Sequence, residues 1–468
     1  MPEICVEQRP AKRSGSSECP IHVVTTETFN QKQKTLTKAQ RNWLDVNSFS
    51  GRAGEMALVQ NEQGKLGCVL YGVASLEGDE KTIDLAVGKL ATLLPEGRYR
   101  FASGISNESD AALAWLLSAY DFKRYSGTEK IWPQLSVGKE VDRHELKLIS
   151  SGVNLARDLI NTPANDMGPQ QLEAAIRKLA KAHKAKVSVI RGDNLLKQNF
   201  PMVHAVGRAS DQPPRLIDLK WGKARAPKVT LVGKGVCFDT GGLNIKPGNS
   251  MALMKKDMGG AANTIGLAAM IMAADLPVRL RLIIPAVENS ISANAFRPGD
   301  VLSSRKGLSV EIGNTDAEGR LVLGDALCLA DEEKPDLLID MATLTGAARV
   351  ALGPDLPPFY CDDEDLVSDI VKAAKATSDP LWQMPFWDRY EGWLDSKIAD
   401  VNHISTGGFA GSMTAALFLR RFVEHAQTYI HFDIYGWAPA MLPGVPYGGA
   451  AQGIRALYSV IKNRYDKS

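Results

Sequence analysis

The second half of the chain alternates short apolar runs with amphipathic stretches, and this alternation restricts the fold more than any other feature. Apolar runs that predict strands lie at 229–232, 279–287, 336–341 and 429–434. Helical patterns lie between and after them, at 258–274, 319–332, 364–377, 412–425 and 449–461. Several of the strands are almost continuously apolar, which is typical of strands covered by helices on both faces. The pattern predicts an α/β domain with a mostly parallel central sheet flanked by helices.

The first half shows the same α/β character on a smaller scale. Strands are predicted at 21–24, 56–60 and 66–73, and helices at 84–94, 109–120, 139–160 and 170–186. The long pattern at 139–160 ends near Pro163, a helix stop signal. We therefore expect two α/β domains, divided as a flexible tail at 1–18, an N-terminal domain at 19–138, a linker helix at 139–165 and a C-terminal domain at 166–468.

Composition excludes several functional classes. The 468 residues carry 55 Lys and Arg against 53 Asp and Glu, a net charge of +2, so no overall charge favours nucleic acid or membrane binding. No apolar run is long enough to span a bilayer. The 6 cysteines include no Cys-x-x-Cys pair, and residues 1–19 lack the apolar core of a secretory signal. We expect a cytoplasmic protein.

An acidic stretch from Gly313 to Arg320 carries unusual chemistry. Asp316, Glu318 and Arg320 alternate with small residues, so three charged groups can converge on a tightly packed backbone. Two carboxylates this close repel each other unless cations neutralise them, and one arginine is too little for a buried pair. The stretch therefore indicates a metal site.

A second stretch, from Val232 to Ala262, strengthens this interpretation. It places Lys234, Asp239, Lys246 and Asp257 among many glycines directly after a predicted strand. Connections at the carboxyl ends of strands line the binding crevice of an open α/β sheet. We therefore expect the carboxylates of both stretches to meet there and to bind more than one divalent ion. No histidine pair has the spacing of a zinc site of the HExxH type.

Other chemistries fit less well. The residues Gly233-Lys234-Gly235 lack the spacing of a phosphate-binding P-loop, and no Gly-x-Ser-x-Gly elbow is present. Cys237 and Cys328 lie among apolar neighbours and are better explained as core residues than as nucleophiles. A binuclear phosphoester hydrolase and a scaffold or DNA-binding protein with an idle site both remain open.

Both stretches resemble the leucyl aminopeptidase (cytosol aminopeptidase) family. The matching segments are Gly233-Lys-Gly, Phe238-Asp-Thr-Gly-Gly, Ile245-Lys-Pro, Asp257-Met-Gly-Gly-Ala-Ala and Asn314-Thr-Asp-Ala-Glu-Gly-Arg320. Residues 156–165, 341–346 and 399–402 also resemble family segments, whereas the N-terminal domain resembles the family only in its α/β character. The stretch that begins at Tyr435 is less typical of the family.

The resemblance implies a metal-dependent aminopeptidase that removes leucine and other neutral N-terminal residues from peptides by attack of a metal-bridging water. It implies two divalent ions per subunit, Zn²⁺ or Mn²⁺, and a homohexamer with peptide as substrate. One ion would be held by Lys234, Asp239, Asp257 and Glu318, with the lysine neutral, and the other by Asp239, Asp316 and Glu318.

The same resemblance assigns roles around the metals. Lys246 would polarise the scissile carbonyl, and Arg320 would hold a bicarbonate that acts as the base, a planar anion suited to a guanidinium. Substrate contacts would come from Met254, Thr343, Leu344 and Gly346.

Overall fold

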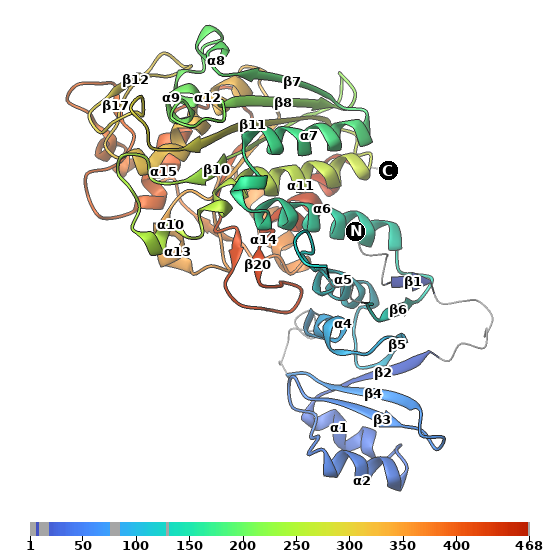
Figure 1. The fold of residues 1–468 in the computed structure, drawn as a ribbon. Helices are drawn as coiled ribbons and strands as arrows, with labels where there is room; N and C mark the ends of the chain where they lie inside the picture. The colour runs from blue at the N-terminus through green and yellow to red at the C-terminus, as the bar shows by residue number, and fades with distance from the viewer. Residues whose placement is uncertain (1–5, 9–17, 75–84, 128–130, 467–468) are drawn as a thin grey trace. The chain divides into compact units, whose positions relative to one another are not determined.

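The chain folds into two compact units (Figure 1). The computed structural model describes residues 6–8, 18–74, 85–127 and 131–466. One unit comprises residues 1–150 and 440–447, and the other comprises residues 151–439 and 448–468. The boundary falls within the long helix α6 (Arg143–Asn161). Both units combine sheets with helices, so the predicted α/β class is confirmed.

The smaller unit is built on a six-stranded sheet in the order β1-β6-β5-β2-β4-β3, in which only β3 and β4 pair antiparallel. Alternate residues of β2 and β4 enter different apolar clusters, as the period of a strand requires. Trp115 packs in one cluster, and Phe29 and Leu44 pack in the other. The elements are β1 (Val6–Gln8), β2 (Cys19–Val24), α1 (Thr26–Gln33), α2 (Lys38–Val46), β3 (Met56–Gln60), β4 (Leu66–Gly72), α4 (Leu90–Leu93), β5 (Arg98–Ser103), α5 (Glu108–Ser118) and β6 (Gln134–Val137).

The larger unit is organised around a nine-stranded sheet in the order β16-β15-β18-β14-β9-β11-β8-β7, with β10 beside β11. The strands β18, β14, β9, β11 and β10 run parallel, and the antiparallel pairs involve β7, β8 and β15. This confirms the predicted mostly parallel central sheet. The strands are β7 (Lys186–Arg191), β8 (Arg215–Trp221), β9 (Lys228–Gly233), β10 (Gly235–Asp239), β11 (Arg279–Asn289), β14 (Leu337–Ala342), β15 (Pro358–Tyr360), β16 (Trp382–Met384) and β18 (Tyr429–Asp433).

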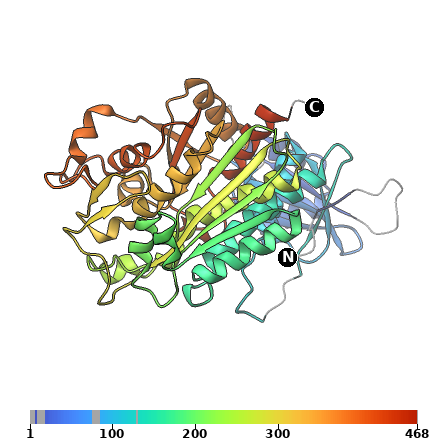
Figure 2. The same cartoon turned by 90° about the horizontal axis from the view of Figure 1, so that it is seen from above.

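Helices cover both faces of this sheet (Figure 2). Val232 on β9 packs in the cluster that contains α12, whereas the next residue, Gly233, faces Ala261 on α11, so the two helices lie on opposite faces. The helix α11 is buried along almost its whole length. The helices are α7 (Pro169–His183), α8 (Asn194–Lys197), α9 (Pro201–Gly207), α10 (Gly248–Met251), α11 (Gly259–Ala273), α12 (Glu318–Asp331), α13 (Gly346–Leu352), α14 (Glu364–Ala376), α15 (Gly411–Arg420) and α16 (Ile454–Tyr465).

Several boundaries differ from the sequence prediction. The helix expected at 84–94 is a short turn at Val87–Lys89 followed by α4, and Asp84 lies outside the described residues. The helix expected at 170–186 ends at His183, because Lys184 adopts a left-handed backbone with φ of 57°. The helix expected at 412–425 ends at Arg420, and the one expected at 449–461 begins at Ile454.

Candidate metal and substrate site

Three of the predicted site residues lie where parallel strands end. Lys234 directly follows β9, Asp239 is the last residue of β10, and Thr343 directly follows β14. Because β9 and β14 are neighbouring parallel strands, their carboxyl ends meet at one edge of the sheet. The sheet therefore brings these three residues together as predicted.

Short helical turns supply the remaining carboxylates at this edge. Asp257 lies in the 3-10 turn η3 (Met254–Met258), immediately before α11. Gly260 allows α11 to approach β14, because a Cβ atom there would lie 2.0 Å from the carbonyl oxygen of Met341. Asp316 lies in the turn η4 (Thr315–Ala317), and Glu318 is the first residue of α12.

Lys234 is shared by two buried carboxylates. Its Nζ lies 2.7 Å from Asp257 Oδ2 and 3.0 Å from Glu318 Oε1, and it donates a hydrogen bond to the Thr343 carbonyl oxygen at 3.0 Å. The lysine stem passes over Gly319, where a Cβ atom would lie 2.5 Å from Lys234 Cε. The glycine of the Asn314–Arg320 motif thus makes room for the lysine of the other motif.

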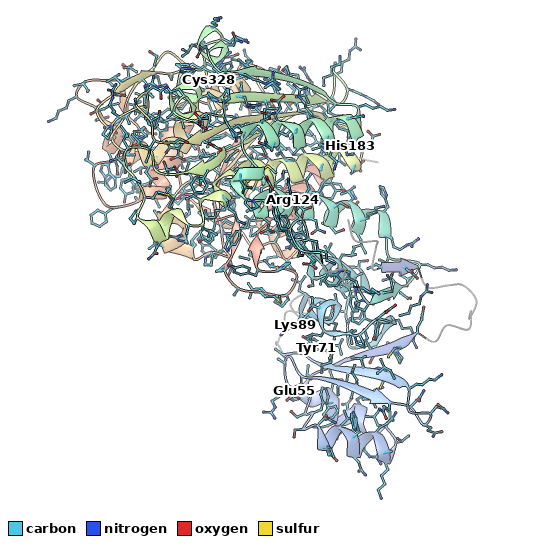
Figure 3. The ribbon with its side chains drawn as sticks, viewed as in Figure 1. Glu55, Tyr71, Lys89, Arg124, His183 and Cys328 are labelled. Atoms are coloured by element: carbon cyan, nitrogen blue, oxygen red, sulfur yellow. The ribbon has the colours of Figure 1, made fainter. Side chains whose placement is uncertain are left out.

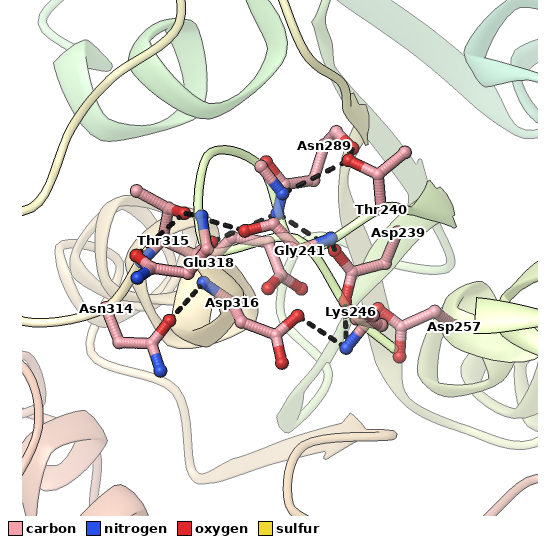
Figure 4. Close-up of polar contacts among 12 residues, drawn as sticks. Asp239, Thr240, Gly241, Lys246, Asp257, Asn289, Asn314, Thr315, Asp316 and Glu318 are labelled. Carbon is pink, nitrogen blue, oxygen red and sulfur yellow. Dashed lines mark hydrogen bonds and ion pairs between the residues drawn. The ribbon is translucent and has the colours of Figure 1, made fainter. Parts of the chain in front are cut away.

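Lys246 links the other two carboxylates (Figure 4). Its Nζ lies 2.8 Å from Asp239 Oδ2 and 2.5 Å from Asp316 Oδ1. The second oxygen of Asp239 accepts hydrogen bonds from the Gly241 amide at 2.8 Å and from Asn289 Nδ2 at 2.9 Å. Asp239 is therefore fixed from both sides, while the Asp316 side chain, 32% exposed, lies on the accessible side of the cluster.

The carboxylates suit a divalent metal ion. One oxygen from each of Asp239, Asp316 and Glu318 can be chosen so that all three lie within 4.8 Å of one another. Both Glu318 oxygens are buried; the Lys234 ammonium lies against Oε1, whereas Oε2 has no partner among the described residues. Buried acceptors without donors carry a large free-energy penalty, which a hard cation with oxygen ligands removes.

The electrostatics of the cluster point the same way. Burial raises the pKa of Glu318, and the charge of Asp239 raises it further. Burial also raises the pKa values of Asp257 and Asp316. Burial alone would lower the pKa of Lys234, but the charges of Asp257, Glu318 and Asp239 outweigh it and raise that pKa. The cluster therefore lacks positive charge even with both lysines protonated.

Arg320 lies next to this cluster with part of its guanidinium unused. It is 7% exposed, and its NH1 donates to the His403 carbonyl oxygen at 2.8 Å. Its Nε is buried and has no hydrogen-bond partner among the described residues. Burial lowers the pKa of Arg320 to about 10, so the group stays charged at neutral pH. An anion can occupy the unused donors.

His403 holds the backbone of the Asn314–Arg320 motif. Its Nδ1 lies 3.2 Å from the Gly313 amide and 3.1 Å from the Glu311 carbonyl oxygen, and its Nε2 lies 2.9 Å from the Asn314 carbonyl oxygen. Burial lowers the pKa of His403 to about 3, so the ring remains neutral. Its role is to position the motif.

Two predicted substrate residues flank Asp257. Thr343 Oγ1 lies 2.9 Å from Asp257 Oδ1 and 2.9 Å from the Asp257 carbonyl oxygen, so the threonine fixes the carboxylate. Met254 begins the same turn as Asp257 and is half-buried. Both therefore lie beside the carboxylate expected to bind the substrate amine.

The other two predicted substrate residues lie in a loop that Asp433 holds. The Asp433 carboxylate accepts hydrogen bonds from the Leu344 amide at 3.1 Å, the Thr345 amide at 3.0 Å and Thr345 Oγ1 at 2.6 Å. Ser412 Oγ donates to the same carboxylate at 2.9 Å. The loop leads into Gly346, the first residue of α13, where the space beyond the backbone is open.

A further cation, Lys256, lies buried beside Asp257. Burial lowers the pKa of Lys256 to about 8, and the charge of Asp257 opposes this shift. The charges of Lys234, Arg349 and Lys246 lower the same pKa further. Lys256 was not among the residues predicted for the site.

Asn289, His403 and Asp433 were also not predicted. Asn289 and Asp433 are the last residues of β11 and β18, and His403 follows the short strand β17 (Val401–Asn402). A single polar residue at the end of an apolar run usually marks a strand end. All three could have been predicted from their positions, because each lies at or just after the carboxyl end of a strand.

The cysteines agree with their interpretation as core residues. Cys237 is 1% exposed, and burial raises its pKa well above the usual range. Burial raises the pKa of Cys328, which lies on α12 (Figure 3), to about 11. Both thiols therefore remain protonated and are poor nucleophiles.

A cluster of carboxylates at the carboxyl edge of a mostly parallel sheet is typical of metal-dependent hydrolases. Two family models match the chain: the M17 aminopeptidase N-terminal domain over residues 19–137 and the catalytic domain of the cytosol aminopeptidase family over residues 154–458. The chain belongs to the cytosol aminopeptidase family, as the sequence motifs predicted, and is a metal-dependent aminopeptidase.

Individual proteins support this assignment. The chain is 36% identical over 454 residues to a probable cytosol aminopeptidase of Syntrophotalea carbinolica, with 90% of each chain covered. It is 37% identical to peptidase B of Pectobacterium carotovorum, covering 89% of this chain and 97% of that protein.

Solved structures agree with the same family. The fold matches the cytosol aminopeptidase from Coxiella burnetii with a TM-score of 0.93 and 42% identity, covering 98% of this chain and 99% of that one. It matches the bottromycin maturation enzyme BotP in complex with Mn with a TM-score of 0.85 and 28% identity, covering 96% and 100%. In the described part of this chain, no helix combines the length and apolar character that a membrane span requires.

Proposed function

We propose that this aminopeptidase releases leucine and other neutral N-terminal residues from peptides at the carboxylate cluster described above. The observation that carries the proposal is the convergence of Asp239, Asp316 and Glu318 on one buried point at the sheet edge, with Asp257 joined to Glu318 through Lys234. A free amine and a scissile carbonyl can both be bound at such a point.

The residues fit two divalent ions, Zn²⁺ or Mn²⁺. Lys234, Asp239, Asp257 and Glu318 would hold the tighter ion, and Asp239, Asp316 and Glu318 would hold the more exchangeable one. A lysine binds a metal only as a neutral amine, and a divalent cation among the same carboxylates favours that form. When bound, the ions polarise the carbonyl and lower the pKa of a water, and bicarbonate supplies a base.

The chain's own side chains orient the peptide. The carboxylate of Asp257, fixed by Thr343, accepts a hydrogen bond from the substrate's amine. Lys246 donates to the scissile carbonyl oxygen as negative charge develops there. Burial would lower the pKa of Lys246, but the charges of Asp239 and Glu318 raise it, so the ammonium is protonated at neutral pH.

Arg320 is the proposed anchor for bicarbonate. Its buried Nε has no other partner among the described residues, and a guanidinium fork matches a planar oxyanion. The backbone of Thr343, Leu344 and Gly346 would bind the peptide chain, and Met254 would line the pocket for the first side chain.

Activity with and without metal tests this proposal. We expect purified chain to hydrolyse leucine anilide and leucyl dipeptides, to lose activity with a chelator, and to regain it with Mn²⁺ or Zn²⁺. A panel of phosphoesters run in parallel should remain intact. A metal-loaded protein that leaves the leucyl substrates untouched would contradict the proposal.

We also propose that the enzyme works in the cytoplasm as a homohexamer. Large apolar side chains are exposed on the larger unit at Trp382, Trp387, Trp393, Ile398 and Phe409, and side chains of this kind are common at subunit interfaces. Sedimentation should give the mass of six chains, and a monomer at micromolar concentration would contradict this assembly.

A further inference from the structure

A buried cation without a carboxylate partner lies beside the amine-binding carboxylate. Lys256 is 5% exposed, and no hydrogen bond or ion pair joins its ammonium to any of the described residues. Its Nζ lies 4.6 Å from the centroid of the Tyr435 ring. Removing an ammonium from water is strongly unfavourable unless a charged partner compensates it, so the buried Lys256 ammonium is an unfavourable group in the protein without a ligand.

A second cation contacts the same ring. The Arg349 guanidinium carbon lies 5.1 Å from the Tyr435 centroid, and Arg349 NH1 lies 3.4 Å from the Tyr435 hydroxyl. No carboxylate among the described residues pairs with Arg349 either. Arg349 comes from α13, three residues after Gly346, whereas Lys256 comes from the turn that carries Asp257.

These cations lie next to the place where the substrate binds. Gly436, which follows Tyr435, packs against Thr343: a Cβ atom at Gly436 would lie 3.0 Å from Thr343 Cγ2. Thr343 in turn contacts Asp257 through its hydroxyl. The charges of Lys234 and Lys246 both act on Lys256, which places its ammonium within electrostatic range of the carboxylate cluster.

We propose that Lys256, Tyr435 and Arg349 form a subsite that binds a carboxylate of the peptide substrate. The inference rests on the proposed function and deepens it by adding a substrate class, peptides with a carboxylate close to the scissile bond. A substrate carboxylate supplies the charged partner that Lys256 lacks, and the Tyr435 ring holds both cations in place.

Three parts of a peptide can supply this carboxylate. They are the side chain of an N-terminal Glu, the side chain of a Glu in the second position, and the free C-terminus of a dipeptide. Three matched substrate pairs distinguish them: glutamyl against glutaminyl anilide, Leu-Glu-amide against Leu-Gln-amide, and Leu-Gly against Leu-Gly-amide. The two substrates of a pair differ only in that one carries a carboxylate where the other carries an amide or a blocked end. The ratio of their kcat/KM values therefore measures the contribution of the carboxylate.

The experiment compares this ratio between the metal-loaded full chain and its Lys256→Met variant. For one pair, we expect the ratio of acid to amide to fall by about tenfold or more in the variant, and Lys256→Arg to restore most of it. Lys255→Met is the matched control, because the Lys255 ammonium already donates to the Asn161 carbonyl oxygen at 2.7 Å. Its ratios should equal those of the wild type.

Unchanged ratios for all three pairs in Lys256→Met would overturn the inference, since a purely structural lysine affects acid and amide substrates equally. If Lys256→Met does not fold, Arg349→Gln on the exposed side provides the second test, and it should lower the ratio for one of the pairs. Loss of turnover on every substrate by the wild type would contradict the proposed function instead, so the two failures are distinguishable.

Discussion

At the scale of single residues, the site depends on how its charges are shared between two motifs. Lys234 from one motif lies against Glu318 from the other, and Gly319 admits its stem. Lys246 and Asp316 repeat this arrangement on the accessible side. Each of these lysines therefore pairs with one carboxylate of its own stretch and with one carboxylate of the Asn314–Arg320 motif.

The Glu318→Gln substitution tests this sharing. It keeps the shape of the side chain but removes the charge that pairs with Lys234 and that would bind both metals. We expect kcat/KM on leucine anilide and the affinity for Mn²⁺ to fall more than about 100-fold, since even residues that only support ligands contribute about 10–100-fold. Glu332→Gln is the control, because Glu332 pairs with Arg305 on the surface. Unaltered Mn²⁺ affinity in Glu318→Gln would remove Glu318 from the ligand set.

At the scale of elements, the loop between β14 and α13, which we propose to bind the substrate backbone, is held by hydrogen bonds from a neighbouring strand. Its amides are held by Asp433 at the end of the neighbouring strand β18. Ser412 on α15 and Tyr360 on β15 extend this network, with the Tyr360 hydroxyl 2.7 Å from Ser412 Oγ. Three elements thus determine the position of one short loop.

Asp433→Asn should loosen this loop. The amide that replaces one carboxylate oxygen cannot accept hydrogen bonds, so at least one loop donor loses its partner. We expect KM for leucyl dipeptides to rise about tenfold with a smaller change in kcat, because one lost buried hydrogen bond costs about 1–3 kcal/mol. Ser412→Ala should cause a smaller change in the same direction. A lowered melting temperature with unchanged KM would show that Asp433 is only structural.

A cluster of ion pairs around one buried glutamate joins α7, β7 and β8. Glu173, 5% exposed, forms ion pairs with Arg177, Arg191 and Arg215. Burial alone would raise the pKa of Glu173, but hydrogen bonds from these arginines lower it from 4.5 to about 2. A lowered folded-state pKa means that the stabilisation is complete above pH 4.5 and is lost as the pH falls towards 2.

This pH dependence can be checked by measuring the free energy of unfolding of Glu173→Gln and of the wild type at several pH values. At pH 7 the variant should unfold with a free energy lower by up to about 3 kcal/mol, and the gap should narrow below pH 4.5. A gap that is independent of pH between 7 and 3 would show that charge pairing is not the cause.

Sequence patterns predicted the buried elements better than the exposed ones. The central strands β9, β11, β14 and β18 are apolar on both faces and were predicted. The edge strand β7 was missed, because its half-exposed residues continue a lysine-rich helical pattern. The helix α1 buries only Phe29 and shows little helical periodicity, so its sequence pattern does not reveal it. The helix α2, which buries Leu44, was also missed, although its sequence is amphipathic.

The site shows the same division. Every residue predicted from the two motifs lies on or next to the carboxyl edge of the sheet, because charged residues among glycines are distinctive in a sequence. Four residues near the site were missed: Asn289, His403, Asp433 and Lys256. Their contacts are with residues more than 20 positions away in the sequence or with the Tyr435 ring, and a sequence pattern does not reveal such contacts.

At the scale of the whole molecule, metal binding should be coupled to folding of the larger unit. All proposed ligands come from this unit, and none of them is assembled in the unfolded chain. At a free Mn²⁺ concentration one hundred times Kd, we expect stabilisation by about 2.7 kcal/mol. Scanning calorimetry should show one transition that rises with Mn²⁺ in the wild type but not in Glu318→Gln, and equal shifts in both would place the metal elsewhere.

We propose that the carboxylate cluster binds the metal ions on which peptide hydrolysis depends. The most direct measurement titrates chelator-treated chain with Mn²⁺ while bound metal and leucine anilide hydrolysis are followed together. We expect activity to appear as two ions bind per subunit, and Asp316→Asn to lose the weaker ion and the activity together. Full activity before any metal binds, or an Asp316→Asn variant with both ions and full activity, would contradict the account.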